Sequence, residues 1–142
     1  MVKQISVFVE NKHGRVMEIL QVLAEAKVDI KALSLADTSE FGVMRMIVSD
    51  AEKAKEAFKD DGVIMKICNV TAVAVEDTPG ALMNTFAILC DNEIATEYMY
   101  AFAEKLDGES VIAIRCDKPE LAEEKLLSGG VHVLTQQEVE KL

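Results

Sequence analysis

The chain has 142 residues, half of them hydrophobic, with only two prolines and a formal net charge of −10 at pH 7. A surface this acidic repels phosphate backbones, so the composition disfavours nucleic acid as a partner. No apolar run approaches the roughly 18 residues of a membrane span, and the first strand pattern follows Met1-Val2-Lys3-Gln4 directly, without a signal peptide. We therefore expect a globular cytoplasmic protein that has no membrane partner.

The sequence lacks the residue motifs that would predict catalysis or a metal site. The three cysteines are widely spaced and lie in apolar runs, which predicts buried, reduced thiols rather than disulfides or a metal cage: Cys68, Cys90 and Cys116. The two histidines, His13 and His132, have no suitably spaced Cys or acidic partners. No phosphate-binding loop and no nucleophile beside a basic residue are found. We expect no cofactor, no metal and no catalytic residues.

The sequence repeats itself at an offset of 66 residues. Six identities fall in the same order in both halves: Val7/Val73, Val9/Val75, Glu10/Glu76, Gly14/Gly80, Met17/Met83 and Leu23/Leu89. The repeat predicts two units, residues 1–69 and 70–142. Each is small for a core of its own, so we expect the two units to share buried surface.

In the first half, apolar periodicity and turn residues predict the order βαββαβ. Ile5, Val7 and Val9 alternate as in a strand, and helical spacing starts at Arg15. Later elements are a strand from Val28 to Ala36, a glycine turn over 37–42, a strand over 43–48, a helix capped by Asp50, and a strand over 63–68.

The second half repeats the same order. Its predicted elements are a strand over 71–75, a helix containing Leu82 and Leu89, a strand from Ile94, a returning strand over 111–115, a helix over 119–127 and a strand over 131–134. Right-handed crossovers would turn each half into a four-stranded antiparallel sheet with both helices on one face.

The fold class is therefore α+β, with two ferredoxin-like βαββαβ units. Only Ile67-Cys68-Asn69-Val70-Thr71 connects them, so we expect the units to lie side by side through their second strands, forming one eight-stranded antiparallel sheet. Lys31 and Glu97 are equivalent residues of opposite charge, and an ion pair between them would help to fix that register.

The turn Asp77-Thr78-Pro79-Gly80-Ala81-Leu82 is the main candidate for a ligand site. Pro79 restricts the backbone at the helix entrance, and Gly80 leaves room for close approach. Free N–H groups of Gly80, Ala81 and Leu82 at the helix N-terminus would favour an anion, while Asp77 would hold a cation. The pattern suits a zwitterion, although such a turn is more often only a helix start. Its counterpart Asn11-Lys12-His13-Gly14 strengthens the functional interpretation.

The repeated turn, the βαββαβ order and the phrase Leu23-Ala24-Glu25-Ala26-Lys27-Val28-Asp29-Ile30 resemble the ACT domain. The resemblance covers nearly the whole chain as two tandem copies, with no enzyme attached. The resemblance implies a regulatory module. ACT domains bind amino acids, usually between paired units, through the first turn of one unit and the second strand of its neighbour.

The resemblance implies two candidate sites. One combines Asn11, Gly14, Arg15 and Val16 with Ala95 and Thr96; the other combines Asp77, Gly80, Ala81 and Leu82 with Asp29 and Ile30. His13 replaces the family's usual proline, and Ala95 replaces its Asn or Asp, so the sites differ chemically. We favour the second site because it keeps both polar positions, and its two carboxylates would suit an amine-rich ligand.

The resemblance favours a regulatory protein that senses an amino acid between its two ACT units. The alternative is a regulatory subunit that contacts an enzyme of amino-acid metabolism with weak or no ligand binding of its own. An enzyme on the same scaffold lacks the necessary residues, and an RNA-binding version would need a basic surface. A homodimer is compatible with either regulatory role.

Overall fold

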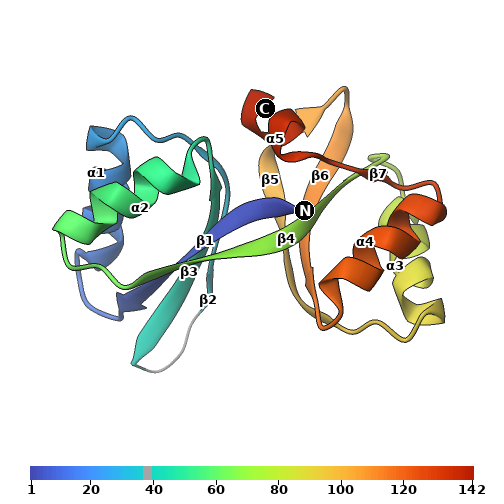
Figure 1. Cartoon of the computed structure of the whole chain (residues 1–142), viewed down its shortest axis with the longest axis horizontal. Helices are drawn as coiled ribbons and strands as arrows, with labels where there is room; N and C mark the ends of the chain where they lie inside the picture. Colours follow the sequence, from blue (N-terminus) through green and yellow to red (C-terminus); the bar gives the residue numbers. More distant parts are fainter. Residues whose placement is uncertain (37–39) are drawn as a thin grey trace. The chain divides into compact units, whose positions relative to one another are not determined.

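The computed structural model describes residues 1–36 and 40–142 and divides into two compact units (Figure 1). The N-terminal unit is Lys3–Cys68, and the C-terminal unit is Asn69–Leu142 together with Met1 and Val2. Residues 37–39 of the predicted 37–42 turn lie outside the described residues. The elements are β1 (Val2–Glu10), α1 (Arg15–Glu25), β2 (Ile30–Ala36), β3 (Phe41–Val48), α2 (Ala51–Asp60), β4 (Met65–Val75), α3 (Ala81–Asp91), β5 (Thr96–Leu106), β6 (Glu109–Cys116), α4 (Pro119–Ser128), β7 (His132–Val133) and α5 (Gln136–Lys141).

The N-terminal unit has the predicted antiparallel sheet, in the order β2-β3-β1-β4. Ile5 lies opposite Met46 in the pairing of β1 with β3. The Phe8 N–H donates to the carbonyl of Ile64 over 3.1 Å, just before β4 begins. Helices α1 and α2 contact each other and lie together on one face of this sheet (Figure 1).

The C-terminal unit repeats this arrangement with the order β5-β6-β4-β7. Val73 of β4 lies opposite Ile112 on one side and Val133 on the other. Helices α3 and α4 also contact each other. Strand β7 has only two residues and is shorter than the predicted strand over 131–134.

Each unit has its own hydrophobic core between sheet and helices. In the N-terminal unit, Val7 and Val9 pack in one cluster with Leu23 of α1. Their repeat partners Val73, Val75 and Leu89 occupy one cluster in the C-terminal unit. Met17 and Met83, also identical in the repeat, are each 70% exposed, so packing in the described chain does not explain that identity.

Strand β4 differs from its sequence prediction. Two separate strands were expected, over 63–68 and 71–75, with a short connection between them. The structure has one continuous strand, Met65–Val75, that carries the boundary between the units at Cys68 and Asn69. No glycine or proline interrupts this segment, and its residues adopt extended backbone throughout. How the two sheets lie relative to each other, including the expected eight-stranded sheet, remains a prediction.

Helix α5 was not predicted, although its start is visible in the sequence. Thr135 accepts a hydrogen bond from the Glu138 N–H, and the Glu138 carboxylate accepts one from the Thr135 N–H over 2.7 Å. This reciprocal capping box satisfies two N–H groups that the helix start would otherwise leave unpaired. Glu138 also binds His132 of β7 over 3.0 Å, which ties the helix to the strand before it.

Replacing Phe58 with alanine should strongly destabilise the N-terminal unit. Its ring is fully buried in the core cluster, and truncating a buried Phe typically costs about 3–5 kcal/mol. The control is Met17→Ala, at a 70% exposed side chain, which should change the free energy of unfolding by less than about 0.5 kcal/mol. Urea denaturation followed by circular dichroism measures both. Equal effects of the two substitutions would contradict this assignment of the core.

The carboxyl group of Glu138 should titrate at unusually low pH. Hydrogen bonds from the backbone and hydroxyl of Thr135, together with that from His132, lower its pKa from 4.5 to about 2. Because the folded-state pKa lies below the unfolded one, the group stabilises α5 above pH 4.5, and this stabilisation disappears as the pH falls towards about 2. Carboxyl ¹³C chemical shifts measure the titration. Thr135→Ala should move the midpoint upward, and an unchanged midpoint would show that the Thr135 hydrogen bonds do not cause the low pKa.

Candidate functional site

The turn between the first strand and the first helix of each unit has the same backbone geometry. The Arg15 N–H donates to the Lys12 carbonyl over 3.3 Å, and the Ala81 N–H donates to the Thr78 carbonyl over 3.2 Å. The third residue of each turn, Gly14 or Gly80, has φ of 86° or 88° and ψ of −12°. These angles and hydrogen bonds define a type II β-turn, which requires a residue with positive φ at its third position.

This turn geometry corrects one expectation about the helix N-terminus. The sequence predicted free N–H groups at Gly80, Ala81 and Leu82. The N–H of Ala81 is not free, because it closes the type II turn. In the described part of the chain, the N–H groups of Gly80 and Leu82 have no protein acceptor. Two donors therefore remain available to an anion at the start of α3 instead of three.

The two predicted carboxylates each have a lysine partner in their own unit. Asp77 binds the Lys105 ammonium over 2.5 Å, and Asp29 binds that of Lys31 over 2.9 Å. These hydrogen bonds and positive charges lower the pKa of both carboxyl groups. Both groups are therefore ionised at neutral pH, and a ligand ammonium would have to compete with a lysine. Their negative charge does not by itself demand an amine-rich ligand.

The start of the second strand is anchored in the same way in both units. Asp29 N–H donates to the Ser49 hydroxyl over 2.9 Å, and Ala95 N–H donates to the Asp117 carboxylate over 2.9 Å. The side chain of Ile30 packs partly on the N-terminal core. Sequence reasoning missed the anchors Ser49 and Asp117, although each lies at the end of a returning strand and before a helix.

Beside the first turn, the N-terminal unit has a groove of about 320 Å³, which we call the turn groove. It contains two of the predicted site residues, Asn11 and Val16. Its lining is Val9, Glu10, Asn11, Lys12, Val16, Leu35, Ala36 and Gly42. Valine and leucine side chains form its walls, while the ion pair of Glu10 with Lys12, 2.9 Å long, lies at its rim. Lys12 also lowers the pKa of Glu10.

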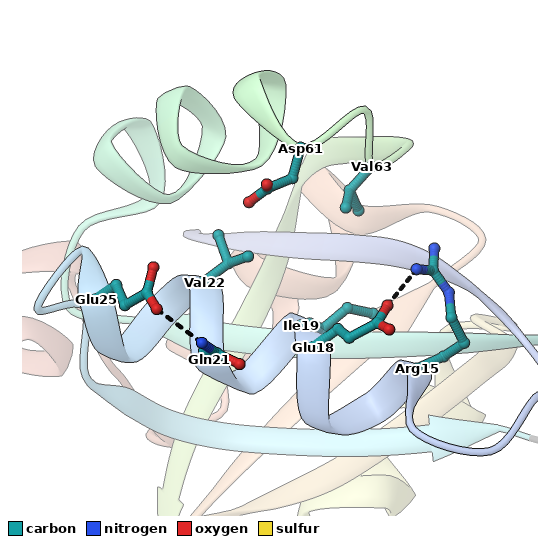
Figure 2. A pocket seen from close by; sticks show the side chains of 8 residues that line it. All are labelled: Arg15, Glu18, Ile19, Gln21, Val22, Glu25, Asp61 and Val63. Atoms are coloured by element: carbon teal, nitrogen blue, oxygen red, sulfur yellow. Dashed lines mark hydrogen bonds and ion pairs between the residues drawn. The ribbon is translucent and has the colours of Figure 1, made fainter.

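Arg15 lines a different cavity, a groove of about 290 Å³ between α1 and the turn after α2 (Figure 2). We call it the helix groove. One guanidinium N–H of Arg15 donates to Glu18, while its Nε is buried and has no hydrogen-bond partner among the described residues. Arg15 therefore extends away from the turn groove that Asn11 and Val16 line.

In the C-terminal unit, a groove of about 360 Å³ is lined by residues of β4, α3, β6 and β7. Ala81 of α3 is one of them. The lining is Ala74, Val75, Glu76, Ala81, Asn84, Thr85, Glu109, Gly130, Val131 and His132. Asp77 and Gly80 are exposed outside it, and Leu82 packs partly on the core. Ala95 and Thr96 are also exposed. The pairings of Asp77 with Asp29 and of Asn11 with Ala95 join different units and remain predictions.

Two further properties of the described residues concern the requirements of a metal site and of a membrane-spanning helix. No group of three or more His, Cys, Asp or Glu in residues 1–36 and 40–142 is arranged to hold a metal ion. In the same residues, no helix combines the length and the apolar composition that crossing a bilayer requires.

Of the cysteines, Cys116 is buried, and this burial raises the pKa of its thiol. Cys90 is exposed on α3, so the expectation that it is buried was wrong.

The residue before the turn glycine gives a direct test of the type II geometry. Proline favours the second position of such a turn, where Pro79 lies in the C-terminal unit and His13 in the N-terminal unit. His13→Pro should raise the free energy of unfolding by about 0.4–1 kcal/mol, because it restricts the unfolded chain. Gly14→Ala should lower it, since φ is positive. Nothing lies within 4 Å of the added methyl group, so the loss reflects backbone strain alone. Thermal denaturation measures both, and destabilisation by His13→Pro would contradict the assigned turn.

Comparison with known proteins agrees with this architecture. The family model described as "ACT domain pair" matches residues 1–142. The crystal structure of protein BT0572 from Bacteroides thetaiotaomicron is similar, with 35% identity, a TM-score of 0.92 and coverage of 99% of this chain and 96% of that one.

A more distant similarity is to the ligand-free regulatory subunit of aspartate kinase from Thermus thermophilus. It has 16% identity, a TM-score of 0.63 and coverage of 89% and 91% of the two chains. A search of curated proteins gave no match. The repeated βαββαβ units, the paired type II turns and the match over the full length show that this chain belongs to the ACT domain pair family.

Proposed function

We propose that this protein is a regulatory protein that binds an amino acid at its strand–helix turns and catalyses no reaction itself. The observation that carries the proposal is the turn groove, where a lysine–carboxylate pair lies beside apolar walls. An amino acid has the complementary parts: an ammonium group, a carboxylate and a side chain. The groove volume of about 320 Å³ is at the small end of ligand pockets, as a ligand of this size requires.

The binding mode follows from the charges at the rim. The ligand ammonium would bind the Glu10 carboxylate and the Asn11 side-chain oxygen, and the ligand carboxylate would bind Lys12. A side chain against Val9, Val16 and Leu35 would have to be apolar, because these walls offer no hydrogen bonds to it. We therefore expect aliphatic amino acids to bind better than polar or charged ones.

The second turn is a further site of the same proposal. Gly80 and Leu82 retain N–H groups for a carboxylate, and Asp77 offers a negative charge once Lys105 moves aside. Asp29 and Ile30 are its predicted partners. The sequence favoured this turn, whereas the groove at the first turn contains two predicted site residues, Asn11 and Val16, and the C-terminal groove contains only Ala81. The two turns can be tested separately.

A specific observation also favours the alternative function, contact with an enzyme. The relative from Thermus thermophilus is named as a regulatory subunit of aspartate kinase, and it matches this chain over nearly its full length. By analogy, this protein would bind an enzyme of amino-acid metabolism and alter its activity. The likeness at 16% identity shows the fold, so the partner enzyme is part of the proposal only.

Thermal-shift measurements against the twenty amino acids test the function. A ligand at 100 times its dissociation constant should stabilise the protein by about 2.7 kcal/mol. Calorimetry then compares variants. Glu10→Gln should weaken binding about tenfold or more, because a charge-assisted hydrogen bond contributes about 1.5–3 kcal/mol and 1.4 kcal/mol corresponds to a factor of ten.

The matched control is Glu76→Gln, at the equivalent position of the C-terminal unit, and Asp77→Asn reports on the second turn. If only Asp77→Asn weakens binding, the ligand occupies the second turn and the groove assignment is wrong. If none of the twenty amino acids stabilises the protein, the enzyme-contact function becomes the better proposal. Turnover of an amino acid by the protein, abolished by one point substitution, would contradict the absence of catalysis.

A further inference from the structure

The helix groove combines an apolar floor with a charged rim. Ile19 and Val22 of α1 and Val63 before β4 form the floor (Figure 2). The other lining residues are polar or charged: Arg15, Glu18, Gln21, Glu25 and Asp61. At about 290 Å³ the groove is large enough for a side chain or for a metabolite of a few heavy atoms.

All but one of the charged groups at the rim are already paired. The Arg15 guanidinium binds Glu18 at one end, and the Gln21 amide donates to Glu25 over 2.8 Å. The Asp61 carboxylate has no partner in the described part of the chain, and it projects over the groove towards Val22 (Figure 2). Three carboxylates against one guanidinium leave a net negative charge, and the unpaired one lies beside the apolar floor.

The equivalent position in the C-terminal unit is filled. Asp61 ends α2 and Gly129 ends α4, each as the residue after the last helical turn. Val22 corresponds to Ile88 at the repeat offset of 66. A methyl group added to Gly129 would lie 2.5 Å from Cδ1 of Ile88, so that side chain lies directly over the glycine. One unit therefore has an isoleucine over a glycine where the other has an open space beside a carboxylate.

We propose that the helix groove binds a primary ammonium group on an aliphatic chain, the chemistry of a lysine side chain. The methylene groups would lie on Ile19, Val22 and Val63, and the ammonium would meet Asp61 and Glu25. Such chains bury their methylene groups on apolar surfaces while keeping the charged end near water. A bare cation would leave the floor uncovered, and an uncharged chain would leave Asp61 unpaired. This inference is independent of the amino-acid site at the turns.

The test uses the full-length protein with ¹³C-labelled valine and isoleucine methyl groups. The probe is Nα-acetyl-lysine N-methylamide, its uncharged isostere is Nα-acetyl-norleucine N-methylamide, and n-butylamine represents a free amine. The lysine probe should give saturable shifts of the Val22 and Val63 methyl signals, and the norleucine probe should not. Tighter binding of the lysine probe than of butylamine indicates a partner protein as the source of the ammonium. Equal binding indicates a free amine, and both results support the proposal.

Variants separate the groove from the general negative charge of the protein. Asp61→Asn should raise the dissociation constant by up to about fivefold, the upper end of the range for an exposed ion pair. Asp91→Asn is the control, because it removes one charge from α3 at the position equivalent to Glu25. Val22→Ile should fill the groove, as Ile88 fills the space beside Gly129. It should therefore abolish the saturable shift of the Val63 methyl groups. Equal weakening by Asp61→Asn and Asp91→Asn, or equal binding of the lysine and norleucine probes, would overturn the proposal.

Discussion

A glycine with left-handed backbone, placed between the first strand and the first helix, is the constraint on which each unit depends. The chain must leave β1 or β4, reverse direction and enter a helix that covers the same sheet. Gly14 and Gly80 make this possible because they alone in their turns have positive φ. The turn brings Leu23 onto Val7 and Val9, and Leu89 onto Val73 and Val75. The core of each unit therefore depends on one backbone conformation at its surface.

Around this common frame the two units differ in their grooves and charges. At the first turn, Glu10 pairs with Lys12, two residues away, whereas at the second turn Asp77, the counterpart of Asn11, pairs with the distant Lys105 of β5. The space beside α1 is open, and the space beside α3 contains an isoleucine over a glycine. These differences lie outside the two hydrophobic cores. The cores can therefore remain similar while the surfaces of the two units differ. This pattern is expected where two copies of one fold serve unequal roles.

Sequence reasoning predicted the elements that depend on local periodicity and turn chemistry. Alternating valines indicated the strands, and Asp50 was correctly placed as the cap of α2, where it accepts a hydrogen bond from the Lys53 N–H. Features that depend on tertiary partners were not predictable in this way. The lysine of Asp77 lies on another strand, and the exposure of Cys90 depends on which face of α3 is covered. The grooves arise from side chains of elements far apart in sequence, so no local pattern indicates them.

Helix α5 is a different case, because its signal was present. Thr135 followed three residues later by Glu138 is a recognisable helix start, but the six-residue helix is too short to show apolar periodicity. The type II turn was also partly hidden. Pro79 indicates it in one copy, while His13 conceals it in the other, and only the repeat shows that the two turns are equivalent.

The course of β4 limits how this protein can be taken apart. In many tandem proteins a flexible spacer offers a protease, or an experimenter, a place to cut between the repeats. Here the boundary falls at Cys68 and Asn69 in the middle of an eleven-residue strand. A cut at that point would leave residues 65–68 of the strand on the N-terminal fragment and residues 69–75 on the C-terminal one. An expression boundary between the two copies would therefore have to lie inside a strand, where the backbone is extended, and not in a loop.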